Sequence, residues 1–267
     1  MPFPARLGFV LLSVPPWVFA MALIADASWA IALWPWAESR LSYIFIASVS
    51  GAIAAPIMWI GLSGELGAAQ GGAINLLMID GFFTAFFLFK GFGEGEARLI
   101  AYGVGSGLAT IAVGAIFLWS TRTPVRDQRP VPLVIRLSFA AFAVLLLVSG
   151  ALVLLRVPGV FPWPLTQETA LLCGVIFIGA SFYFTHAVIW PSRANATGQL
   201  LGFLVYDLIL IGPFLSRFAD VEPEYRVSLV VYTLVIVYSG ALAAFYLATN
   251  LLALARQATE ELALRRS

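Results

Sequence analysis

Eight long apolar segments constrain the fold of this chain more than any other feature. A helix needs about 17–25 predominantly apolar residues to cross the hydrocarbon core of a bilayer. The segments that qualify are residues 7–25, 41–62, 68–89, 99–119, 133–155, 168–190, 199–216 and 227–251. Their apolar residues are continuous rather than alternating with polar ones, which argues against membrane strands. The sequence therefore predicts an all-α integral membrane protein, a helical bundle of eight transmembrane helices.

Composition supports this class and argues against others. Charged residues make up 11% of the chain, whereas about 25% is usual in soluble domains. A net charge of +1 without a basic cluster argues against nucleic-acid binding. The single Cys173 and the single His186 exclude an internal disulfide and cysteine-only or histidine-rich metal sites. No phosphate loop or hydrolase motif occurs, so we expect no cofactor, no metal and no enzymatic activity, although an intramembrane reaction using an aspartate stays open.

The first apolar segment has two interpretations. Arg6, the following apolar run and Ala25-Asp26-Ala27 together imitate a signal peptide with a cleavage site. The alternative, a retained first helix, is favoured because the second half of the chain repeats the same plan. We therefore predict retention.

The distribution of basic residues predicts the orientation in the membrane. Positive charges gather in cytoplasmic loops. When the loops are assigned alternately, one side holds nine basic residues: Arg6, Arg122, Arg126, Arg129, Arg136, Arg193, Arg256, Arg265 and Arg266. The other side holds six: Arg40, Lys90, Arg98, Arg156, Arg217 and Arg226. Both termini are therefore predicted to be cytoplasmic.

Two aspartates lie within predicted spans, Asp80 in the third and Asp207 in the seventh. Ionisable groups at membrane depth are energetically costly, and each one is a candidate functional site. One hypothesis is a pair that handles protons or cations on two related helices, with Thr84, Asn75 and Tyr206 as polar neighbours. The other is two structural acids, protonated or hydrogen-bonded, that hold the bundle together.

An internal repeat relates the two aspartates. Displacing the chain by 127 residues superposes residues 35–90 on residues 162–217 with eight identities in 56 positions, Asp80 on Asp207 among them. Because a four-helix unit has an even number of spans, the two copies would share one orientation. We predict a first unit at residues 1–120, a cytoplasmic connector at 121–132, a second unit at 133–252 and a cytoplasmic helical tail at 253–267.

Tryptophans and glycines add two smaller predictions. Trp34, Trp36 and Trp163 lie next to span ends and are predicted to be anchors in the membrane interface. The glycines of residues 103–107 form a small-xxx-small pattern, which fits a tight contact inside the bundle or, as the alternative, the face of a homo-oligomer. The bilayer itself is the one partner that the sequence specifies, and protein partners are left open.

The segment Trp163-Pro164-Leu165-Thr166-Gln167-Glu168-Thr169-Ala170 resembles a motif of uncharacterised polytopic proteins of bacterial membranes. Their motif reads Trp-Pro-Trp-Pro-Leu-Thr-x-x-Thr-Ala-Arg, and Leu171 stands here in place of its arginine. The similarity covers roughly residues 160–250. It implies a shared architecture and a bacterial inner-membrane location, and it implies no activity.

Two functions from different classes follow. The first is a small transporter or channel-like protein in which Asp80 and Asp207 bind protons or cations between the halves. The second is a non-catalytic accessory or assembly protein whose buried acids are structural. The paired acids favour transport, and the scarcity of other polar groups in the spans favours the accessory role.

Overall fold

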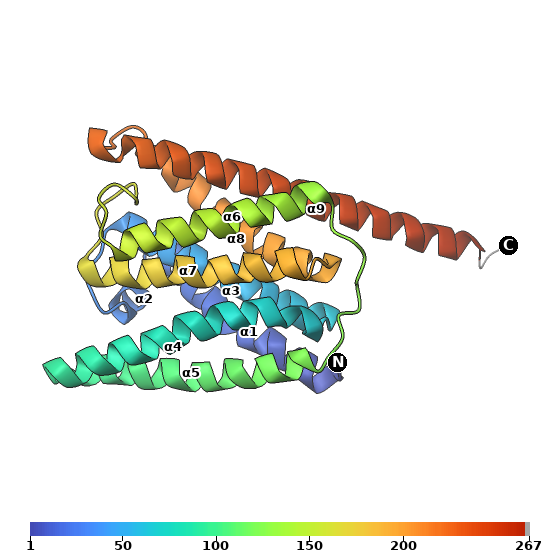
Figure 1. Ribbon diagram of the computed structural model, residues 1–267, viewed down its shortest axis with the longest axis horizontal. Helices are drawn as coiled ribbons and strands as arrows, with labels where there is room; N and C mark the ends of the chain where they lie inside the picture. Colours follow the sequence, from blue (N-terminus) through green and yellow to red (C-terminus); the bar gives the residue numbers. More distant parts are fainter. Residues whose placement is uncertain (265–267) are drawn as a thin grey trace.

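The computed structural model describes the backbone of residues 1–264 and the side chains up to Asn250 (Figure 1). All of its regular elements in this range are helical. They are α1 (Phe3–Ile24), α2 (Ser28–Leu33), α3 (Arg40–Ser63), η1 (Leu66–Ala68), α4 (Ala69–Glu94), α5 (Ala97–Thr121), α6 (Leu133–Leu154), α7 (Gln167–Ile189), α8 (Arg193–Arg217), η2 (Pro223–Tyr225) and α9 (Arg226–Leu264). Eight segments are long and apolar enough to cross a membrane, which confirms the predicted class.

Local sequence explains where several of these helices begin. Ser39, Thr166 and Ser192 each accept a hydrogen bond from the backbone N–H three residues later, at the starts of α3, α7 and α8. Such N-caps satisfy one of the backbone donors that a helix start leaves unpaired. At the other end of α3, Gly64 adopts a left-handed φ of 77°, a conformation that glycine reaches without a steric penalty.

The spanning helices form two rows of four. The largest contacts join α1 to α3, α3 to α8 and α8 to α9, which makes the first row. In the second row the largest contacts join α5 to α4, α4 to α7 and α7 to α6. If α1 to α5 are the first half and α6 to α9 the second, each half contributes two helices to each row. The inner helices α3 and α4 therefore pack on α8 and α7 of the other half.

Equivalent residues make equivalent contacts in the two halves. Arg6 Nε donates to the carbonyl of Gly61 at 3.0 Å, at the end of α3. Arg136 Nε donates to the carbonyl of Val188 at 3.1 Å, at the end of α7, and Val188 is 127 residues after Gly61. In both halves the first helix is thus joined to the last turn of the next.

The aromatic residues at the opposite end follow the same correspondence. The ring centroids of Trp36 and Phe87 are 6.0 Å apart, and those of Trp163 and Phe214 are 5.8 Å apart. Trp163 and Phe214 are each 127 residues after their counterparts. The interplanar angles differ, 12° and 77°, so the pairing is kept although the ring geometry is not.

Polar contacts at this end join the two halves. Thr166 Oγ1 donates to Glu38, and Lys90 Nζ lies 3.1 Å from Glu168 Oε1. These contacts fix the start of α7 against the first half, next to the ends of α3 and α4.

The chain termini lie at the other end of the bundle. Figure 1 shows the N-terminus and the connector between α5 and α6 at the same end, with α9 extending beyond the bundle toward the C-terminus. The predicted tail coincides with the end of α9, except that residues 265–267 lie outside the described residues. Which side of the membrane this end faces stays a prediction.

Candidate functional site

A cavity of about 630 Å³ lies between the two rows, and it is partly open. All eight spanning segments contribute to its lining, so neither half could form it alone. Most lining residues are apolar or aromatic. The polar ones are Asn75, Ser149, Tyr183, Gln199, Tyr206, Asp207, Ser228, Tyr232 and Ser239. A largely apolar cavity with a few converging polar groups is typical of small-molecule sites.

Asp207 is the acidic residue of this lining. Its side chain lies on α8, is only 4% exposed, and neither carboxyl oxygen has a hydrogen-bond partner in the described part of the chain. The hydroxyl of Ser239 is close in the lining but donates to the Val235 carbonyl at 2.8 Å. Gly240 on α9 permits this burial, because a Cβ added there would lie 3.3 Å from the Asp207 Cβ.

Two amide side chains also present unpaired oxygens to the cavity. Gln199, two turns before Asp207 on α8, is 1% exposed; its Nε2 donates to the Tyr183 carbonyl at 2.6 Å while its Oε1 has no partner. The buried Oδ1 of Asn75 on α4 likewise has no partner among the described residues. Gly179 on α7 leaves room for it, since a Cβ there would lie 2.7 Å from that oxygen.

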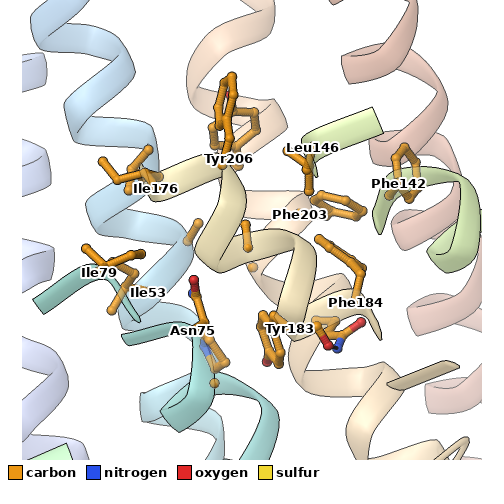
Figure 2. A pocket seen from close by; sticks show the side chains of 18 of the residues that line it. Ile53, Asn75, Ile79, Phe142, Leu146, Ile176, Tyr183, Phe184, Phe203 and Tyr206 are labelled. Atoms are coloured by element: carbon orange, nitrogen blue, oxygen red, sulfur yellow. Dashed lines mark hydrogen bonds between the residues drawn. The ribbon is translucent and has the colours of Figure 1, made fainter. Parts of the chain in front are cut away.

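Aromatic side chains form much of the remaining wall. Figure 2 shows Asn75 and Tyr206 at the cavity, with Phe142, Phe184 and Phe203 grouped at one side. The ring of Phe203 lies 4.7 Å from that of Phe142 and 4.6 Å from that of Phe184. Rings packed at these distances form a stable apolar surface.

The residues predicted as a site from the sequence are divided by the structure. Asn75, Tyr206 and Asp207 line the cavity, whereas Asp80 and Thr84 are not among its lining residues. Thr84 Oγ1 donates to the backbone carbonyl of Asp80 at 2.6 Å, a bond within α4. Asp80 and Asp207 therefore do not share this cavity.

The three tryptophans predicted as interfacial anchors also differ from one another. Trp163 is 3% exposed, lies in the core and donates to Ser42 Oγ at 2.9 Å, so its ring is not placed in the membrane interface. Trp34 and Trp36 are half-buried, and Trp34 Nε1 donates to Thr169 Oγ1 at 3.3 Å. The correction for Trp163 arises because the loop before α7 folds inward over α3.

Gln199 is the cavity residue that the sequence interpretation missed. The predicted seventh span began at residue 199, which placed this glutamine at a solvated helix end. In the structure α8 begins at Arg193, because Ser192 caps it, and Gln199 lies a full turn and more inside the helix. The signal that could have identified it is the cap at Ser192, followed by small residues that allow close packing.

The remaining candidates for chemistry are packed in the bundle. The His186 ring is buried and lies 4.8 Å from that of Trp190, and Cys173 is buried in the core. Among the described residues, no group of three or more His, Cys, Asp or Glu side chains is arranged to hold a metal ion.

Comparison with protein-family models, with curated proteins and with solved structures finds no match to this chain. The similarity to the bacterial membrane proteins with the tryptophan-proline motif therefore stays a prediction.

Proposed function

We propose that this polytopic membrane protein is a proton-linked transporter, in which the cavity between the rows binds a small solute and Asp207 carries the proton. The single observation that supports this most is a buried carboxyl group without a partner, placed on a cavity that is large enough for a solute and is built by both halves.

The surroundings of Asp207 favour this function over a structural role. Buried polar groups that stabilise a fold are hydrogen-bonded in the great majority of cases. Acids inside membrane helices usually pair with other polar groups, and those that face cavities often mark ion or proton pathways. Asp207 has no such pair in the described residues and faces a cavity, which is the second situation.

The arrangement of helices suggests how such a protein would expose the cavity. We include in the proposal that the two halves arose by duplication of a four-helix unit, which the equivalent contacts of Arg6 and Arg136 support. Transporters built from repeats alternate access by rocking one repeat against the other around a central site. The same proposal places the protein in the bacterial inner membrane with both termini in the cytoplasm.

Reconstitution into liposomes that contain a pH-sensitive dye tests the proposal. A potassium diffusion potential drives protons inward, and the rate of acidification is compared for wild type, Asp207→Asn and Asp80→Asn. We expect wild type and Asp80→Asn to acidify the vesicles faster than empty liposomes, and Asp207→Asn to fall to the rate of empty liposomes.

Asp80→Asn is the matched control, since it makes the same chemical change at the corresponding position of the first half. Equal fluxes in all three proteins, each shown to be folded and inserted, would contradict the transport proposal. That result would favour the accessory role instead.

A further inference from the structure

The unpaired polar atoms of the cavity share one property, which is that they accept hydrogen bonds. They are both carboxyl oxygens of Asp207, Oε1 of Gln199 and Oδ1 of Asn75. The other buried atoms without partners in the described residues are Trp17 Nε1, Asn195 Oδ1, Arg217 Nε and Asn250 Nδ2, and those residues do not line the cavity. An empty cavity of this kind lacks donors.

The orientation of the Gln199 amide follows from its contact with the chain. Its Nε2 donates to the Tyr183 carbonyl at 2.6 Å, and exchanging the two ends of the amide would place two acceptors against each other. Oε1 is therefore directed away from that carbonyl, without a donor. A carboxylate offers acceptors alone when ionised, so Asp207 adds two more.

The spacing of these acceptors defines the shape of a matching ligand. Gln199 and Asp207 are eight residues apart on α8, which corresponds to about 12 Å along a helix. Gly202, Phe203 and Tyr206 line the cavity on the same helix between them. A ligand that reaches either acceptor thus has an apolar and aromatic wall for the rest of its body.

We propose that the ligand of this cavity is a lipophilic amine, a cation with N–H donors on an apolar body. Its ammonium group binds Asp207, and its body packs against Phe142, Phe184 and Phe203. Charge-assisted hydrogen bonds to a carboxylate are about twice as strong as neutral ones, and aromatic faces attract cations. This inference deepens the proposed function by naming its substrate class, and it rests on that function only for the transport step.

A series of ligands with one apolar body tests the proposal by binding alone. Phenylbutylamine, phenylbutyltrimethylammonium, phenylbutanol and phenylbutyrate differ only in the polar group. Each is titrated by calorimetry into the full-length protein in lipid nanodiscs. The amine is expected to bind most tightly, because it has both charge and donors. The trimethylammonium compound keeps the charge without donors, the alcohol keeps a donor without charge, and the carboxylate is expected to bind weakest.

The same titration with Asp207→Asn and Asp80→Asn locates the site. We expect Asp207→Asn to weaken the amine about tenfold or more, as loss of a hydrogen bond to a charged group does, and to change the affinity of the alcohol less than twofold. Asp80→Asn is expected to bind all four compounds as wild type does. The wild-type series remains decisive if the Asp207 variant does not fold.

Equal affinities for the four compounds, preference for the carboxylate, or absence of binding would overturn the amine proposal. Amine binding that depends on Asp207, together with no proton flux in liposomes, would retain the site and contradict transport. Proton flux that depends on Asp207, without amine preference, would retain transport and contradict this ligand class.

Discussion

Asp207 and Asp80 are the same residue at matching positions of the two halves, and their surroundings make them different. Asp207 is packed beside Gly240 and faces the cavity. Asp80 is half-buried on α4, away from that cavity. At the residue scale, therefore, the capacity for chemistry follows from the neighbouring helix rather than from the acid itself.

A second acid, Asp127, has a structural role that can be tested with pH. The Arg129 guanidinium donates two hydrogen bonds to this carboxylate, at 2.7 and 2.5 Å, and holds the pKa of Asp127 below its usual range. The backbone carbonyls of both residues accept from the start of α8, from Ala194 and Arg193. The pair thereby joins the connector between the halves to the second half.

Asp127→Asn is expected to lower the free energy of unfolding at pH 7 by about 1 kcal/mol or less, because the pair is partly exposed. A carboxyl whose pKa is lower in the folded state stabilises above its unfolded pKa of about 3.9. That stabilisation is lost as the pH falls through the folded pKa. The gap in thermal midpoint between wild type and variant should therefore close in acid. A gap that is constant from neutral to strongly acidic pH would contradict this role.

At the scale of elements, close approach of helices depends on particular glycines. Gly103 on α5 faces α4, and a Cβ there would lie 2.9 Å from the backbone nitrogen of Leu88. Gly105, two residues later on the same helix, has no atom within 4 Å of such a Cβ. The glycine-rich segment at residues 103–107 thus serves a contact inside the bundle at its first position.

Gly103→Ala is expected to destabilise the protein by about 1–3 kcal/mol, the usual effect of overpacking. Gly105→Ala serves as the control and should leave stability unchanged or raise it by up to about 1 kcal/mol through helix propensity. Thermal unfolding in detergent measures both. Equal effects of the two substitutions would show that α5 does not pack on α4 through Gly103.

Element boundaries show what the sequence could and could not predict. The eight spans follow from apolar length alone, and their positions agree with the prediction within a few residues at most ends. The short α2 was not predicted, because its six residues lie in a connection rich in small and apolar residues without periodicity. Trp163 was misplaced because a tryptophan beside a span end fits an interfacial anchor as well as a core residue, and only the tertiary contact with Ser42 decides between them.

At the scale of the whole molecule, the central cavity is a product of tertiary pairing. The sequence indicated that Asp207 is buried and that Asp80 corresponds to it. It could not indicate that α3 packs on α8 and α4 on α7, which places the cavity between the rows and joins Asn75, Gln199 and Asp207 at one site. Contacts between distant segments are not encoded in local periodicity.

The central claim is that Asp207 exchanges its proton through the cavity, and infrared difference spectroscopy of the protein in lipid tests it most directly. Spectra recorded at successive pH values reveal the carbonyl stretch of each carboxyl group that gains or loses a proton. We predict a titrating carboxyl band that is present in wild type and in Asp80→Asn and is absent in Asp207→Asn. Identical titrating bands in all three proteins would show that Asp207 is sealed from protons and would contradict the account.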